Sequence, residues 1–333
     1  MKEVLLTPKL QSAALRAFRG ALLRWYDEHG RDLPWRRTRD PYRIWISEIM
    51  LQQTRVAAVL EHYRIFLERF PNLSALAAAS EGSVLAAWSG LGYYRRAHML
   101  HQCAREVVQE YRGCFPQSSK ALQELPGIGR YTAAAIASIA FAEPVAVVDG
   151  NVERVLQRMN GAKLTSVETW DHAERLLSRS RPGDFNQAMM ELGATVCTPR
   201  QPRCGACPVR KWCVTQGEEV QSRKAPSRQV KKEIWCALDR RDGHVRLVRR
   251  SVNDSVMAGM WELPQLPPKA SRVPSEPDYW RAFRHSITVT DYTVHVARRA
   301  APGAKGKWVA IEKIPNIPIT GLTRKILKAG GII

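Results

Sequence analysis

The chain has 333 residues, enough for two domains with a sizeable buried core. Lysine and arginine number 51 against 31 aspartate and glutamate, and the formal net charge of +20 predicts a polyanionic partner, with nucleic acid the first candidate. No apolar run reaches membrane length, and the first ten residues lack the apolar segment of a secretory signal, so we expect a cytoplasmic protein.

Helical patterns fill the first two thirds of the chain. An amphipathic helix is expected over residues 11–29, and a long helix that begins at Asp40-Pro41 is expected to continue through residues 44–70. Further helices are expected over residues 73–79, 83–89, 93–111, 119–125, 130–142, 151–177 and 184–194. The fold class of this part is therefore mainly α.

Glu48 lies in the long predicted helix, four residues after Ile44 and three before Leu51, so it shares a face with apolar side chains. One interpretation is an acid at the edge of that stripe, satisfied by Arg55 or by a helix dipole. The other is a carboxyl that its neighbours desolvate, with a pKa raised toward neutrality and suited to giving up a proton. The helix alone leaves both open.

The segment Leu125-Pro-Gly-Ile-Gly predicts a tight turn before the helix that starts at residue 130. Gly127 and Gly129 permit a positive φ and a close backbone approach. The unpaired amides at the start of the next helix suit a phosphate. The same pattern also serves as an ordinary turn between helices.

Asp149 precedes the next predicted helix and also has two interpretations. It can be the N-cap of that helix, or a carboxylate held at the mouth of a cleft. The two are compatible, because a cap fixes the side chain.

Residues 90–96 read Gly-Leu-Gly-Tyr-Tyr-Arg-Arg and combine accessible backbone, aromatic faces and positive charge. This mixture suits a distorted nucleic acid, in which a side chain wedges into a base step. The alternative is a capped helix start with core tyrosines.

Four of the seven cysteines share one short loop with the spacing C-x6-C-x2-C-x5-C: Cys197, Cys204, Cys207 and Cys213. Four thiolates in one loop can hold zinc or an iron–sulfur cluster. Zinc ribbons usually pair two C-x2-C motifs, so the uneven spacing here favours a 4Fe-4S cluster. The other three cysteines are expected to be small core residues: Cys103, Cys114 and Cys236.

The composition changes after the cysteine loop. Residues 215–232 are polar and charged, and we expect them to link a domain of residues 1–214 to a domain of residues 233–333. The second domain is expected to be α+β, with strands over 234–238, 245–248, 287–290, 292–296 and 308–311, a hairpin turn at 241–244, and helices over 279–284 and 322–328.

As a set, these motifs resemble the endonuclease III superfamily of base-excision DNA glycosylases, and within it the adenine-specific branch. The signatures are LPWR at 33–36, SEIMLQQT at 47–54, GLGYYRRA at 90–97 and VDGNVERVL at 148–156, together with the cysteine loop at 197–213. The resemblance implies a two-lobed, all-helical helix-hairpin-helix domain with an iron–sulfur loop. The MWELP stretch at 260–264 extends the resemblance to a C-terminal Nudix-like α+β domain.

The resemblance also implies a reaction, the hydrolysis of the N-glycosidic bond of adenine mispaired with 8-oxoguanine or guanine after the base is flipped out. Glu48 falls on the general acid that protonates adenine N7, and Asp149 on the carboxylate that stabilises the oxocarbenium ion. Tyr131 and Asn151 match supporting positions. Tyr131 replaces a Schiff-base lysine of the endonuclease III branch, which implies a monofunctional enzyme.

The remaining correspondences concern the ligands. Trp35, Arg36 and Gln187 would line the adenine pocket, and Gln53 and Tyr93 would insert near the flipped or opposite base. Gly127 and Gly129 would bind a phosphate, and the four loop cysteines would bind a 4Fe-4S cluster with a structural role. The implied partner is double-stranded DNA with an A:8-oxoguanine or A:G mispair, bound by a monomer at a bacterial nucleoid.

One departure from the resemblance concerns lesion recognition. The superfamily's adenine branch often reads 8-oxoguanine through a Phe-Ser-His hairpin, whereas this chain has Ile287-Thr288-Val289. Thr288 keeps a hydroxyl that can bond to the lesion, but the aromatic ring and the imidazole are missing. No glutamate-rich Nudix hydrolase motif follows Pro264, so the second domain is expected to bind nucleotides without hydrolysing them.

Two other functions are considered. The first is excision of thymine or uracil from mismatches with G, and the LPWR and LQQT signatures and the Nudix-like extension argue against it. The second is a non-catalytic DNA-binding protein, and the presence of both Glu48 and Asp149 argues against that.

Overall fold

The computed structural model describes residues 12–217, 230–251, 253–254, 256–266, 278–287, 290–301 and 306–333. The chain divides into two compact units, residues 1–53 with 103–223 and residues 54–102 with 224–333. Across the described ranges, no helix is both long enough and apolar enough to cross a membrane.

The first unit is helical. Its elements in chain order are α1 (Ser12–His29), η1 (Pro34–Arg36), α2 (Pro41–Leu51), α7 (Ser119–Leu122), α8 (Arg130–Ala140), α9 (Gly150–Asn160), α10 (Ser166–Leu176), α11 (Pro182–Thr195), η2 (Cys204–Ala206) and η3 (Arg210–Trp212). Helix α6 (Arg95–Glu110) contains the boundary between the two units. The predicted helices of this part are confirmed to within a few residues, apart from a break at residues 161–165 and the case described below.

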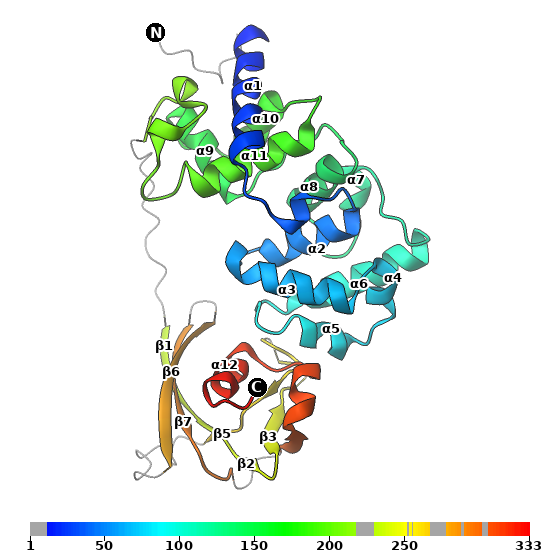
Figure 1. Cartoon of the computed structure of the whole chain (residues 1–333), viewed down its shortest axis with the longest axis vertical. Helices are drawn as coiled ribbons and strands as arrows, with labels where there is room; N and C mark the ends of the chain where they lie inside the picture. Colours follow the sequence, from blue (N-terminus) through cyan, green and yellow to red (C-terminus); the bar gives the residue numbers. More distant parts are fainter. Residues whose placement is uncertain are drawn as a thin grey trace. The chain divides into compact units, whose positions relative to one another are not determined.

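Helices α1, α9, α10 and α11 share one hydrophobic core, and α1 and α11 lie side by side (Figure 1). Phe18 and Leu22 of α1 are fully buried in it, with Leu156 of α9. Trp212, at the end of the cysteine loop, packs edge-on against Phe18 with ring centroids 5.4 Å apart. The cysteine loop is therefore anchored in the same core as α9 and α11, the two helices that carry predicted site residues.

The single helix expected through residues 44–70 is wrong. The chain forms α2 and then α3 (Val56–Arg69), and residues 52–55 between them are not helical. Gln53 has a φ of +56°, in the left-handed region, which a right-handed helix cannot contain. No glycine or proline marks this break, and apolar residues recur on both sides of it, so the sequence pattern does not show it.

The second unit combines helices with two sheets. Its elements in chain order are α3, α4 (Leu73–Ala78), α5 (Glu81–Ala87), β1 (Val230–Ala237), β2 (Arg240–Arg241), β3 (His244–Arg249), β4 (Trp261–Glu262), β5 (Gln265–Leu266), β6 (Tyr279–Ile287), β7 (Thr290–Ala297), β8 (Lys307–Ala310), η5 (Ile311–Asn316) and α12 (Gly321–Ala329). One sheet has the order β5-β1-β7-β6, with β1 parallel to β7. In the other, β3 pairs with β2, β4 and β8.

The α+β character of the C-terminal region is confirmed, as are the helix near residue 322 and the turn at 241–244. Asp242 and Gly243 have φ of +46° and +72° between the paired residues Arg241 and His244, as a tight hairpin requires. The helix expected over 279–284 is wrong, because these residues form β6, which pairs along its length with β7. Cys114 is also wrong as a core residue, since it is exposed. The proposed domain limits stay a prediction, because most of the expected linker lies outside the described residues.

Candidate active site

Glu48 is buried in α2, with only 5% of its surface exposed. Tyr131, near the start of α8, donates a hydrogen bond of 2.7 Å to Oε2 of Glu48. The pKa of Glu48 is raised to about 7: burial is the largest cause and the charge of Asp149 adds to it, whereas the Tyr131 hydrogen bond and the charge of Arg36 act in the opposite direction. Of the two interpretations of Glu48, the structure therefore agrees with the desolvated acid.

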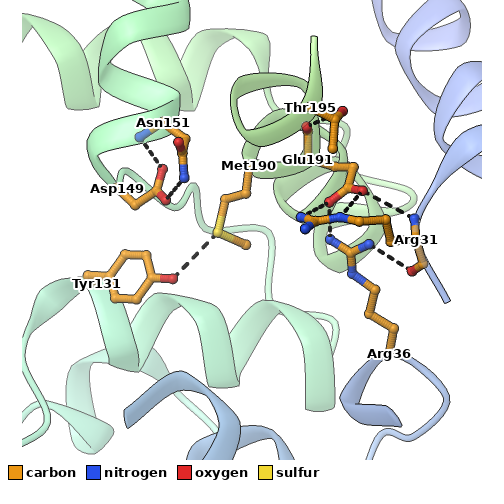
Figure 2. Close-up of polar contacts among 8 residues, drawn as sticks. All are labelled: Arg31, Arg36, Tyr131, Asp149, Asn151, Met190, Glu191 and Thr195. Carbon is orange, nitrogen blue, oxygen red and sulfur yellow. Dashed lines mark hydrogen bonds and ion pairs between the residues drawn. The ribbon is translucent and has the colours of Figure 1, made fainter. Parts of the chain in front are cut away.

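Asp149 is the N-cap of α9, as one interpretation of the sequence expects. Its Oδ1 accepts hydrogen bonds from the backbone amides of Asn151 and Val152, at 2.9 and 2.8 Å. Its Oδ2 accepts one from Asn151 Nδ2 at 2.8 Å (Figure 2). The charge of Asp149 acts on both Glu48 and Tyr131, and it contributes to raising the pKa of each. The fold therefore brings together the four residues predicted to form the catalytic centre.

The predicted pocket residues lie on η1 and α11. Trp35 is 6% exposed and Gln187 is 8% exposed, so both side chains are buried. Arg36 donates a 2.7 Å hydrogen bond to Oε2 of Glu191, which lies one helical turn after Gln187. Glu191 is not among the site residues predicted from the sequence. The available signal was an acid inside the otherwise apolar and small-residue run AMMELGA, but nothing local identified its partners.

The two glycines of the predicted phosphate turn differ in conformation. Gly127 has a φ of +75°, as expected. Gly129 does not have a positive φ, because it is the N-cap of α8 with a φ of −86°. A Cβ at Gly129 would meet no heavy atom within 4 Å, so the start of α8 faces open space at this point. The turn keeps the features that suit a phosphate, but only Gly127 is required by its backbone conformation.

Gln53 and Tyr93, the predicted inserting side chains, are both non-glycine residues in the left-handed region, with φ of +56° and +49°. Such conformations cost about 1–3 kcal/mol and gather at functional sites. Gln53, in the first unit, is exposed. Tyr93, in the second unit, is 50% exposed, and the guanidinium of Arg96 lies 5.3 Å from its ring centroid. The core-tyrosine interpretation holds only for Tyr94, which is 6% exposed.

Thr288, the predicted contact to the lesion, lies outside the described residues. On either side of it, Ile287 at the end of β6 pairs with Thr290 at the start of β7. Its contact with DNA stays a prediction.

The loop that carries Cys197, Cys204, Cys207 and Cys213 is tied to the end of α9 by Arg158, which is 7% exposed. Arg158 donates to the carbonyl of Thr198 at 2.7 Å and to Sγ of Cys197 at 3.3 Å. Its own carbonyl accepts from Sγ of Cys213 at 3.5 Å. The first and last cysteines of the motif are thereby held at one residue of α9.

The donor set suits an iron–sulfur cluster. The pKa of the Cys207 thiol is raised to about 11, mainly by burial, and the charges of the three other loop cysteines contribute to the rise. Four thiols that lie together in one loop can be the ligands of an iron–sulfur cluster.

Comparison with known proteins agrees with this arrangement. Residues 46–181 match the HhH-GPD superfamily of base excision DNA repair proteins, and residues 197–213 match the iron–sulfur binding domain of endonuclease III. The chain is 44% identical to the adenine DNA glycosylase of Mycolicibacterium smegmatis over 230 residues, which are 65% of this chain and 78% of that protein. The chain belongs to the adenine DNA glycosylase family. The predicted cluster and superfamily are thereby confirmed.

Other members of the adenine DNA glycosylase family are longer. The chain is 45% identical over 284 residues to the enzyme of Mus musculus and 50% identical over 216 residues to that of Homo sapiens. These matches cover 80% and 60% of this chain but 54% and 40% of the two mammalian proteins, so the chain spans about half the length of these relatives.

Solved structures confirm the helical fold. A thermostable thymine-DNA glycosylase matches with a TM-score of 0.58 and 33% identity, over 61% of this chain and 97% of that one. An endonuclease III–DNA complex matches with a TM-score of 0.54 and 22% identity, over 62% of this chain and 97% of that one.

Proposed function

We propose that this protein is a monofunctional adenine DNA glycosylase that acts on adenine mispaired with 8-oxoguanine or guanine in double-stranded DNA. The observation that carries the proposal is the buried Glu48 carboxyl, with a pKa of about 7, hydrogen-bonded by Tyr131 and under the charge of Asp149. A carboxyl that is half protonated near neutral pH can act as a general acid there. The family membership supports the same assignment.

In the proposed reaction, the adenine nucleotide leaves the duplex, and Glu48 transfers its proton to N7 of the base. The bond between N9 and the sugar then breaks with its electron pair on the neutral adenine, which leaves an oxocarbenium ion. The Asp149 carboxylate, oriented by three hydrogen bonds at the start of α9, stabilises this cation. Water adds to the anomeric carbon, and its proton returns to Glu48.

The proposed enzyme is monofunctional because the residue beside Glu48 is a tyrosine. A phenol cannot condense with the sugar aldehyde to an imine, so β-elimination through a Schiff base has no nucleophile at Tyr131. Borohydride should therefore trap little or no covalent complex with DNA. Efficient trapping would contradict this part of the proposal.

The cysteine loop and the C-terminal region would bind DNA without taking part in hydrolysis. Bound by the four loop cysteines, the 4Fe-4S cluster supplies a rigid cross-link to a basic loop that includes Arg200, Arg203, Arg210 and Lys211. We propose further that the region from residue 233 is a Nudix-like domain that recognises the base opposite the adenine, with Thr288 among its contacts.

A panel of duplexes tests the function. Adenine release is expected from A:8-oxoguanine and from A:G, with none from T:G. Glu48→Gln should reduce base release by on the order of 10²–10⁴-fold while DNA affinity stays near that of the wild type. Release of thymine from T:G would favour the thymine glycosylase activity, which the structural match at 33% identity keeps as the second candidate. Equal base release by Glu48→Gln would reject the catalytic assignment.

A further inference from the structure

Glu191 is a fully buried carboxylate whose hydrogen-bond partners come from the segment before α2 (Figure 2). Its Oε1 accepts from the backbone amide of Arg31 at 3.2 Å and from Arg31 Nε at 2.7 Å. Its Oε2 accepts from Arg31 Nη2 and from Arg36 Nη2, both at 2.7 Å. Four hydrogen bonds thus occupy both oxygens, about as many as a carboxylate can accept.

Arg36 has an orientation fixed from several sides. Besides Glu191, its guanidinium donates through Nη1 to the carbonyl of Arg31 at 3.0 Å and lies 5.4 Å from the ring centroid of Tyr26. Only 13% of the Arg36 side chain is exposed. A long arginine side chain is flexible, so these contacts restrict it to one position.

That position is close to the catalytic centre. The charge of Arg36 acts on the Glu48 carboxyl, and it favours the ionised form. The other charged and titratable groups that act on Glu48 are Tyr131 of α8 and Asp149 at the start of α9. On α11, Met190 next to Glu191 accepts a 3.5 Å hydrogen bond from the Tyr131 hydroxyl. One turn of α11 therefore contacts Tyr131 through Met190 and Arg36 through Glu191.

Glu191 is the group that holds Arg36 there and remains ionised. Burial raises its pKa, but hydrogen bonds and charges from Arg31 and Arg36 outweigh burial and lower it to about 2. Glu191 is therefore anionic throughout the pH range in which Glu48 titrates. Removing its charge would leave two guanidinium groups without their buried partner, a costly arrangement from which Arg36 would turn away.

We propose that Glu191 is a positioning residue, which through its ion pairs with Arg31 and Arg36 fixes the Arg36 guanidinium where its charge acts on the Glu48 carboxyl. The inference deepens the proposed function, and only its effect on base release rests on that function. The alternative is that Glu191 only stabilises the packing of residues 31–36 against α11. Its removal would then lower the stability of the protein without changing the pKa of Glu48.

The direct test is a titration of Glu48 in the full-length holoprotein, with glutamate labelled with carbon-13 at the side-chain carboxyl. The Glu48 signal is assigned by its absence from Glu48→Gln. In the wild type, the pKa is expected at about 7. In Glu191→Gln it should rise, because the released Arg36 no longer favours the ionised carboxyl. In an Arg36→Met background, Glu191→Gln should cause no further change, since both substitutions remove the same interaction.

An unchanged pKa in Glu191→Gln would overturn the proposal, as would a lower pKa, because Arg36 would then keep its place without Glu191. If Glu191→Gln raised the Glu48 pKa equally in the wild-type and the Arg36→Met backgrounds, that result would overturn the proposal too. Should Glu191→Gln not fold, Glu191→Asp replaces it. The shorter carboxylate cannot reach both arginines, so the Glu48 pKa should again rise, and an unchanged value would count against the proposal.

Base release supplies the second measurement. Glu191→Gln should slow single-turnover adenine release on the order of 10²-fold, through misplacement of Arg36. The matched control is Asp32→Asn, which removes an exposed ion pair with Arg37 in the same segment and should release adenine at the wild-type rate. If no duplex supports base release, the proposed function fails, while the titration still decides the role of Glu191.

Discussion

The hydroxyl of Tyr131 donates a 2.7 Å hydrogen bond to Oε2 of Glu48 across 83 positions of the chain. The bond gives a buried carboxyl a partner, and it opposes the effect of burial on the Glu48 pKa, which lies at about 7. Tyr131, which by the resemblance replaces a lysine of the endonuclease III branch, thus contacts the predicted general acid itself. Its hydrogen bond lowers the pKa of Glu48, and in the proposed reaction its lack of an amine excludes a Schiff base.

Tyr131→Phe should shift the pH dependence of base release. The tyrosine hydrogen bond favours the ionised form of Glu48, so its loss raises the pKa of Glu48 above about 7. Because the protonated acid is the active form, the alkaline limb of the rate profile should move to higher pH by about one unit. Single-turnover rates between pH 5 and 9 measure this. A limb that stays in place, or moves to lower pH, contradicts the role assigned to Tyr131.

Glu48→Gln should stabilise the protein at alkaline pH. The pKa of Glu48 is about 7 in the folded protein against 4.5 in the unfolded chain, so the free energy of unfolding is highest below pH 4.5 and falls as pH rises through 7. Above pH 7, the ionised, buried carboxylate should cost on the order of 3 kcal/mol.

Urea unfolding at pH 5 and pH 8.5 measures this difference. Glu48→Gln should gain stability over the wild type at pH 8.5 and much less at pH 5. Glu110→Gln, at an exposed position of α6, is the control and should show no such dependence. A stability difference that does not change with pH would contradict the assigned pKa.

Gly127→Ala and Gly129→Ala should have different consequences. Gly127 has a φ of +75°, so an added Cβ costs about 1–2 kcal/mol, and thermal unfolding should occur at a lower temperature. Gly129 has a φ of −86° and open space around it, so its substitution should affect stability less. The added methyl group would instead project where a phosphate is proposed to approach, and DNA affinity should fall. Wild-type affinity in Gly129→Ala would place the phosphate elsewhere.

Substitution of the loop cysteines should remove the cluster. Each of Cys197→Ser, Cys204→Ser, Cys207→Ser and Cys213→Ser is expected to reduce or abolish the visible absorption of the purified protein, because a serine hydroxyl is a poor ligand for iron. Cys114→Ser is the matched control, since Cys114 is an exposed cysteine outside the loop, and it should leave the absorption unchanged. A colourless wild-type protein containing zinc would contradict the cluster assignment.

Local signals in the sequence were sufficient for much of this molecule. The spans of most helices followed from apolar periodicity, and the N-cap role of Asp149 from its place before α9. The spacing of the cysteines indicated the cluster loop. These features depend on neighbours a few residues away, which the sequence shows directly.

Where strands and loops depend on contacts with distant parts of the chain, the predictions from sequence were wrong. Residues 279–284 were predicted to form a helix, yet pairing with β7 makes them part of a strand. The break between α2 and α3 has no glycine or proline to announce it. Gly129 could have adopted a positive φ, but its role as the N-cap of α8 uses an ordinary one.

By itself, the sequence determined which acids, arginines and cysteines were available and on which helices they would lie. Only the tertiary structure decided that Glu48 is buried and hydrogen-bonded by Tyr131, and that Glu191 pairs with Arg31 and Arg36, which lie 155 or more positions away in the chain. The physical reason is that a pKa near 7 and a fixed guanidinium arise from desolvation and from contacts between distant segments. Neither exists until the helices pack.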